Sequence, residues 1–152
     1  MATSTATRIR YETYVQATPE KLWQALTDPA MTQGYFYGSA IHSDFKPGSA
    51  IVSKGPDGSV MSDGTVVEAK PGERLVQTMR LAYDPEIAAD RPSRVTWTIV
   101  PMGKVSQLVL EHDDFDGETR TYRDAVGGWP VIVSGLKTLV ETGKPLEMPQ
   151  GG

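Results

Sequence analysis

His42 and His112 are the two side chains of this sequence that suit proton transfer near neutral pH. His112 ends an alternating stretch in which Leu108 and Leu110 share its parity, so we expect its imidazole to point inward. The acids around it are Glu111, Asp113, Asp114 and Asp116. His112 is therefore the best single candidate for a general acid or base, in an enzyme of cyclase or hydrolase type. With no partner in view, the simpler interpretation is a histidine at a strand end that is satisfied by a neighbour or by water.

The sequence gives little support to nucleophilic, phosphate-binding or metal chemistry. It contains no cysteine, and Ser134 lies in an expected helix without a G-x-S-x-G motif. No Gly-Lys-Ser/Thr follows Gly127 and Gly128, so these glycines form no phosphate loop. Asp114 and Asp116 near His112 lack a compact ligand spacing and are better read as solvated loop acids. We predict no metal site, no cofactor, and no catalytic residue other than His112 if the protein is an enzyme.

A long helix near the C-terminus is the element around which any site must be built. The pattern predicts it from Gly127 to Gly143, with Gly128 as a cap and Pro130 in the first turn, where its missing N–H costs nothing. Its apolar residues recur at three- and four-residue spacing and form one stripe that must be buried. They are Trp129, Ile132, Val133, Leu136, Leu139 and Val140.

An alternative is one longer helix that also includes Tyr122, Ala125 and Val126. Pro130 would then clash with the Val126 carbonyl, so this helix requires a kink. In both cases we expect a flexible joint at Gly127-Gly128, because glycine weakens a helix interior.

The rest of the chain predicts a sheet preceded by two short helices. Residues 8–16 alternate as a first strand, Thr18-Pro19-Glu20 starts a helix, and a second short helix follows from Ala30 to Gln33. From Gly38 onward, period-two stretches alternate with tight turns rich in Gly and Pro, including turns predicted at Pro56-Asp57-Gly58 and at Asp63-Gly64. Residues 83–92, with two prolines, are the best candidate for a long loop. The expected architecture is an α+β fold in which a curved antiparallel sheet wraps around the C-terminal helix.

A curved sheet and a helix leave space between them, so this architecture favours an apolar cavity. Tyr35, Phe36 and Tyr37 form an aromatic run that either plugs the junction between helix and sheet or borders the cavity entrance. We expect Arg80 and Arg94 on the solvated face; turned inward, either would pair with a ligand carboxylate. The alternative to a cavity is a dry, filled core. The candidate ligand-binding residues are Trp23, Tyr35, Phe36, Tyr37, Met79, Trp97, Leu110, Trp129, Val133 and Leu136.

Composition limits the class of protein. With 152 residues, 39% of them hydrophobic, we expect one domain over residues 8–144, with a flexible leader over 1–7 and a tail over 145–152. A net charge of -4 argues against nucleic-acid binding, which requires clustered Lys and Arg. No apolar run is long enough to span a membrane, and the absence of cysteine fits a reducing cytoplasm, so a cytoplasmic protein is expected.

Five segments together form a specific pattern: ATPEKLWQALTDP at 17–29, SDFKPGS at 43–49, TWTI at 96–99, LVLEHDDF at 108–115, and GGWP followed by LKTLVETG. In this pattern the chain resembles the homologues of the heat-shock protein 90 ATPase activator C-terminal domain, of AHSA type, within the START-like, Bet v 1-like or SRPBCC superfamily. The resemblance runs from Tyr11 to Gly143. It implies the helix-grip fold, in the order strand, two helices, six strands, helix.

The resemblance implies function only broadly, since superfamily members bind lipids, sterols, hormones or polyketide intermediates, and a few are cyclases. The family often has a Trp-Phe pair where this chain has Tyr35-Phe36, so the pocket entrance is expected to differ. The eukaryotic co-chaperone carries a further N-terminal domain for which a seven-residue leader leaves no room, and we do not carry its activity over. We predict binding of a small lipid-like or aromatic apolar molecule. The alternatives are an enzyme using His112 and a chaperone-linked module that binds a protein partner.

Overall fold

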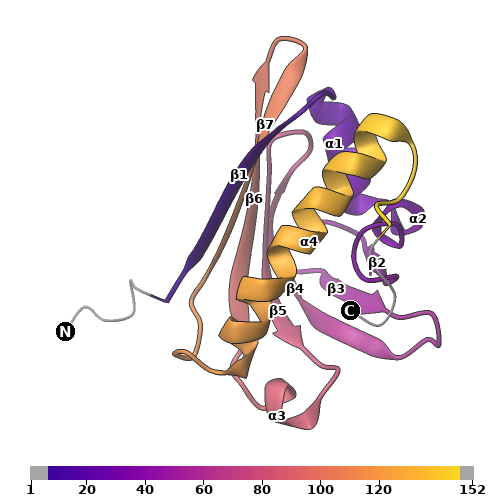
Figure 1. Ribbon diagram of the computed structural model, residues 1–152. Helices are drawn as coiled ribbons and strands as arrows, with labels where there is room; N and C mark the ends of the chain where they lie inside the picture. Colours follow the sequence, from indigo (N-terminus) through magenta and orange to yellow (C-terminus); the bar gives the residue numbers. More distant parts are fainter. Residues whose placement is uncertain (1–6, 148–152) are drawn as a thin grey trace.

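Seven antiparallel strands form one sheet in the order β1-β7-β6-β5-β4-β3-β2 (Figure 1). The computed structural model describes residues 7–147; most of the expected leader and the last five residues of the expected tail lie outside them. The strands are β1 (Ile9–Val15), β2 (Ala40–Ser43), β3 (Ala50–Lys54), β4 (Val60–Lys70), β5 (Arg74–Leu81), β6 (Ser93–Met102) and β7 (Val105–Asp113). The helices are α1 (Pro19–Thr27), α2 (Pro29–Thr32), α3 (Pro85–Ala88) and α4 (Arg120–Thr142).

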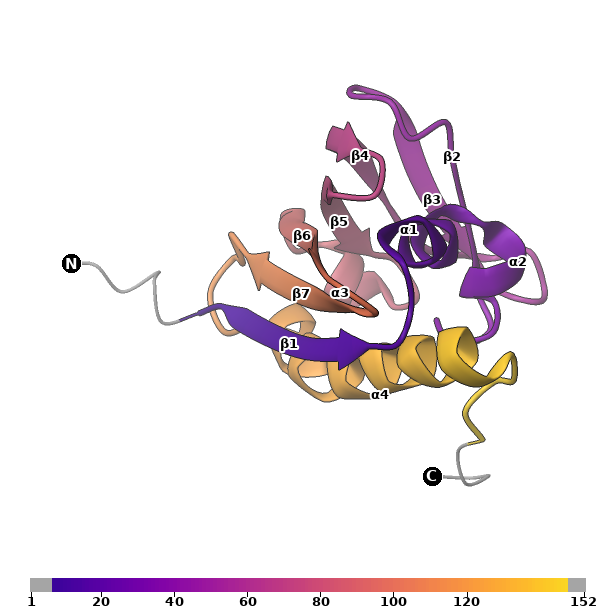
Figure 2. The ribbon, with the colours of Figure 1, turned by 90° about the horizontal axis from the view of Figure 1, so that it is seen from above.

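The two short helices α1 and α2 form where their caps predict. Thr18 caps α1 by accepting a hydrogen bond from the Lys21 N–H at 3.2 Å, and Asp28 caps α2 by accepting one from the Ala30 N–H at 2.9 Å. A proline occupies the first turn of each helix, where no backbone N–H is needed. Figure 2 shows both helices beside the C-terminal half of α4.

Helix α4 begins at Arg120, so the predicted start at Gly127-Gly128 was wrong and the longer alternative is the observed one. Pro130 has no N–H to donate to the Val126 carbonyl, and Val126 lies on the exposed side of the helix. Contacts outside the helix hold the extra turns: the Thr121 hydroxyl donates to Asp90, and the Tyr122 ring packs edge-on against Phe115. Tertiary packing therefore outweighs the local signal of Pro130.

The C-terminal end of α4 is as predicted. Gly143 adopts a left-handed conformation with φ of 79° and donates its N–H to the Leu139 carbonyl at 2.8 Å. The predicted apolar stripe faces the sheet, with Leu139 half-buried and its other members buried. The predicted loop at 83–92 contains the short helix α3, whose cap is Asp84.

The sheet wraps around α4, which runs along its inner face (Figures 1 and 2). Irregular register in β4, between Val66 and Glu68, increases the local bend. One hydrophobic cluster joins residues of α1, α4 and all the strands, with Leu22, Leu110 and Leu136 at 0–1% exposure. The molecule therefore has the predicted α+β helix-grip fold.

Candidate functional site

A cavity of about 100 Å³ lies between the inner face of the sheet and α4. Its wall is mostly apolar and aromatic, with a few hydroxyls, one imidazole and one carboxylate. The lining residues are Phe36, Tyr37, Ser39, Ser53, Met61, Ser62, Met79, Leu81, Tyr83, His112, Asp124, Ala125, Gly128, Trp129 and Ile132. An apolar interior with a few polar groups is the usual composition of a small-molecule site.

Trp129 is the centre of the aromatic cluster beside this cavity. Its ring lies edge-on to Phe36, Trp97 and His112, with ring centroids 6.0, 5.7 and 5.7 Å away. Edge-to-face pairs at these distances are attractive beyond the area they bury. Helix α4 thus presents a rigid aromatic surface to the cavity, held from both sides by residues of the sheet and the α2–β2 connection.

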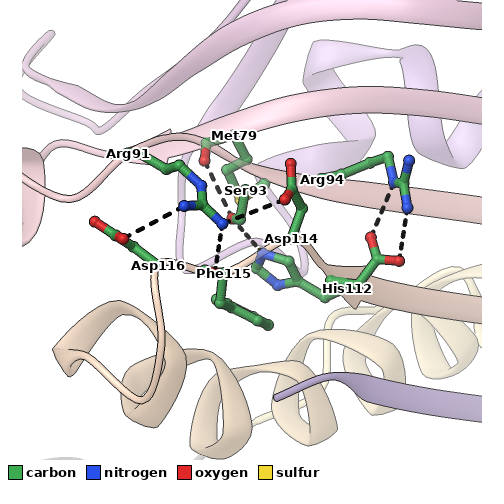
Figure 3. Close-up of polar contacts among 9 residues, drawn as sticks. Met79, Arg91, Ser93, Arg94, His112, Asp114, Phe115 and Asp116 are labelled. Carbon is green, nitrogen blue, oxygen red and sulfur yellow. Dashed lines mark hydrogen bonds and ion pairs between the residues drawn. The ribbon is translucent and has the colours of Figure 1, made fainter. Parts of the chain in front are cut away.

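His112 has protein partners on both ring nitrogens. The Trp129 indole N–H donates to Nδ1 at 2.8 Å, and Nε2 lies 2.6 Å from the Ser93 hydroxyl. An indole can only donate, so Nδ1 must be the unprotonated nitrogen and Nε2 must carry the hydrogen. Ser93 then accepts from Nε2 and donates to the Met79 carbonyl at 3.3 Å, as Figure 3 shows. The hydrogen bonds therefore run in one direction, from Trp129 through His112 and Ser93 to the Met79 carbonyl. This direction requires the neutral tautomer of His112 that is protonated on Nε2.

Burial lowers the pKa of His112 to about 3, against a smaller opposite effect of the Asp113 charge. Phe115 covers the imidazole, with ring centroids 4.2 Å apart. At neutral pH the ring is uncharged, and neither nitrogen is free for a substrate. The geometry therefore supports a structural role for His112 more strongly than general acid–base catalysis.

Tyr37 and Tyr83 lie at the mouth of the cavity and bind α4. The Tyr83 hydroxyl donates to the Asp124 carboxylate at 2.7 Å, and the Tyr37 hydroxyl donates to the Gly128 carbonyl at 3.4 Å. Burial, followed by the Asp124 hydrogen bond and charge, raises the pKa of Tyr83, so this phenol remains a donor. Tyr37 is 59% exposed and Tyr83 is 44% exposed, so both residues face solvent as well as the cavity.

The predicted ligand-binding residues divide into two groups. Four line the cavity, namely Phe36, Tyr37, Met79 and Trp129. The others pack into the hydrophobic core around it: Trp23, Tyr35, Trp97, Leu110, Val133 and Leu136. Tyr35 fills the helix–sheet junction, where its hydroxyl donates to the Ala25 carbonyl at 2.7 Å and burial raises its pKa. Within the aromatic run, Tyr35 thus fills the junction, while Phe36 and Tyr37 line the cavity.

Arg80 and Arg94 bind carboxylates and are absent from the cavity lining. Arg80 pairs with Asp63 at 2.7 Å, and Arg94 pairs with Asp113 at 2.8 Å. Each guanidinium lowers the pKa of its partner, mainly through the side-chain hydrogen bond. Among residues 7–147, no group of three or more His, Asp or Glu side chains is placed to hold a metal ion.

Several lining residues could not be identified from the sequence alone. Ser53 on β3 is paired with Ser62 on β4, and Ser62 is also paired with Leu81 on β5. The turn at Pro56-Asp57-Gly58 was the available signal, because a hairpin closed there brings residues 53 and 62 together. Tyr83 and Asp124 meet only through tertiary structure, since they lie 41 positions apart in the sequence.

A sequence model of the family described as "Activator of Hsp90 ATPase homolog 1-like protein" matches residues 16–141. No curated protein sequence matches the chain significantly. Among solved structures, protein MLL2253 from Mesorhizobium loti is similar with 29% identity and a TM-score of 0.74, covering 88% of this chain and 96% of that one.

Two further structures share the fold. DynU16, a protein of the dynemicin biosynthetic locus, has 23% identity and a TM-score of 0.74, with 91% of this chain covered but 49% of DynU16, so the chain spans about half of it. PFC0360w, an HSP90 activator from Plasmodium falciparum, has 20% identity and a TM-score of 0.71, covering 91% of this chain and 97% of that one. In the part of the chain that the structure describes, no helix is long and apolar enough to cross a membrane.

Proposed function

This chain belongs to the family of activator of Hsp90 ATPase homolog 1-like proteins, and we propose that it binds a small, largely apolar molecule in the cavity between its sheet and α4. The molecule inserts an aromatic or similarly flat apolar group beside Trp129, and any remainder extends outward between Tyr37 and Tyr83. The lack of cysteine fits a reducing compartment, and we place this binding in the cytoplasm.

The observation that carries the proposal is the unfilled space itself. Protein interiors pack with few voids larger than a water molecule, yet about 100 Å³ remains next to Trp129, Phe36 and Met79. Apolar cavities of about 150 Å³ take up benzene. The space here is smaller than that, so an aromatic ring would enter it in part, and the rest of the ligand would lie at the mouth.

The two competing functions have weaker support. An enzyme that uses His112 needs a free ring nitrogen, whereas both nitrogens bind Trp129 and Ser93. A chaperone-linked module predicts a filled core and a contiguous exposed apolar patch. Binding of a protein partner is the alternative function, because of the family name and the fold shared with the Plasmodium protein.

The experiment is a two-dimensional NMR titration that follows the three tryptophan indole N–H signals. Single-ring aromatics, fatty acids, sterols and flavonoids are added in turn. We expect saturable shifts of the Trp129 signal and smaller ones of Trp97, which packs on it. Trp23 does not line the cavity and serves as the internal control.

A cavity-narrowing variant makes the test specific. Ala125 lines the cavity from α4, so Ala125→Leu should fill part of it and abolish the Trp129 shift while leaving the other signals dispersed. Shifts that persist in Ala125→Leu, or a Trp129 signal that no compound moves, would count against the proposed function. In the second case, capture of a protein partner becomes the better hypothesis.

A further inference from the structure

Two serine hydroxyls form a polar spot on the otherwise apolar sheet side of the cavity. Ser53 on β3 and Ser62 on β4 are directly paired in register, and their hydroxyl oxygens lie 2.7 Å apart. Both side chains are buried, at 2% and 7% exposure, and both line the cavity. Buried hydroxyl groups of this kind nearly always donate their hydrogen to an acceptor.

The Ser53–Ser62 pair has two hydroxyl hydrogens but forms only one hydrogen bond within the pair. Each hydroxyl has one hydrogen, and the bond between Ser53 and Ser62 consumes one of the two whichever residue donates. Among residues 7–147, neither hydroxyl has another hydrogen-bond partner. One O–H of the pair is therefore left without a protein acceptor, and a buried donor in this state is destabilising unless a ligand or water accepts from it.

The other polar groups of the cavity wall are already committed. The Ser39 hydroxyl donates to the Phe36 carbonyl at 2.6 Å, and the tyrosine hydroxyls at the mouth donate to α4. The Trp129 indole N–H donates to His112, and the other ring nitrogen of His112 donates to Ser93. Among the described side chains that line the cavity, the serine pair thus supplies the uncommitted donor.

We propose that the ligand is an aromatic compound with a carbonyl or similar oxygen acceptor next to its ring, and that this oxygen binds the Ser53–Ser62 pair. This inference rests on the proposed function and specifies its ligand class. The ring packs against Trp129, while the ligand oxygen accepts a hydrogen bond from the O–H of the serine pair that has no protein acceptor. Aliphatic hydrocarbons and aromatics without an acceptor leave that donor unpaired and bind more weakly.

The test compares two probes with the same number of non-hydrogen atoms, acetophenone and cumene. The carbon attached to the ring carries a carbonyl oxygen in acetophenone and a second methyl group in cumene. Their dissociation constants are measured from the Trp129 indole signal with the full chain. We expect acetophenone to bind roughly three- to tenfold more tightly, the size of one net hydrogen bond. Replacing both serines (Ser53→Ala with Ser62→Ala) should remove this preference by weakening acetophenone while cumene binds at least as well.

Ser106→Ala is the matched control, because Ser106 is also buried but donates to the Ala17 carbonyl at 2.8 Å, away from the cavity. It should retain the preference for acetophenone. Equal affinity of the two probes for the unmodified protein, or a preference that survives in the double variant, would overturn the inference while leaving the cavity a binding site. If neither probe moves the Trp129 signal, the proposed function and the inference fail together.

Discussion

His112 shows how one residue can be placed correctly and still have a role that the sequence does not reveal. Its alternation with Leu108 and Leu110 predicted an inward imidazole, and the ring is buried. Its partners come from β6 and α4, separated from it by 19 and 17 residues. No local spacing encodes those contacts, so the choice between a catalytic and a satisfied histidine required the tertiary structure.

The buried neutral histidine predicts a pH-dependent stability. The folded pKa is about 3, below the ordinary value of 6.5, so the unfolded chain binds the proton more tightly between those values. This contribution is complete above about pH 6.5 and is lost as the pH falls toward the folded pKa. We expect a loss of about 2 kcal/mol in the free energy of unfolding between about pH 7 and about pH 5, a range above the ordinary pKa values of Asp and Glu.

Urea unfolding at several pH values measures this loss. His112→Gln should be less stable overall, but its free energy of unfolding should change much less over the same range. His42→Gln is the control, because His42 is exposed and should keep the slope of the unmodified protein. An unchanged slope in His112→Gln would show that other groups cause the pH dependence.

At the level of elements, β4 and β5 come into close backbone contact at Gly64. A Cβ at this position would overlap the Thr78 carbonyl oxygen, and the neighbouring Thr65 N–H donates to the Thr78 hydroxyl at 2.9 Å. Glycine is therefore required here by the contact between strands rather than by its φ angle. The sequence signalled only a turn at Asp63-Gly64, whereas the structure places both residues inside a long strand.

Gly64→Ala should lower the free energy of unfolding by about 1–3 kcal/mol or more, because the backbone of β5 has to move. Gly127 provides the contrast, since it lies in α4 and a methyl group added there would meet no other atom within 4 Å. Gly127→Ala should raise the free energy of unfolding by about 0.5–1 kcal/mol, as in other helix interiors. Thermal or urea unfolding checks both, and a harmless Gly64→Ala would contradict the assigned close approach.

The glycine pair in α4 also bears on ligand entry. The predicted joint at Gly127-Gly128 lies between the N-terminal part of α4 and Trp129, beside the Tyr37 hydroxyl, and we propose that it acts as a gate. Gly128→Val should stiffen the helix and slow both binding and release of an aromatic ligand several-fold. Gly127→Ala should slow them as well, although it touches no neighbour. NMR exchange measurements give both rates, and unchanged rates in the two variants would rule out the joint as a gate.

For the whole molecule, the sequence predicted the architecture better than the site. Alternation, caps and the apolar stripe of α4 are local signals, and they led to the helix-grip fold. The cavity instead depends on the distance between the curved sheet and α4. No local sequence pattern predicts that distance. Large residues such as Trp97 and Leu110 were predicted to face a ligand but pack into the core, while two small serines form part of the cavity wall.

The most direct test of a ligand site in this cavity uses nuclear Overhauser effects between bound acetophenone and ¹³C-labelled methionine methyl groups. Met61 and Met79 line the cavity, whereas Met31 lies in α2 and packs against the hydrophobic core, and Met102 is exposed at the end of β6. We predict contacts from the ligand ring to the Met61 and Met79 methyl groups and none to those of Met31 and Met102. Contacts confined to Met31 or Met102, or none at ligand saturation, would contradict binding between the sheet and α4.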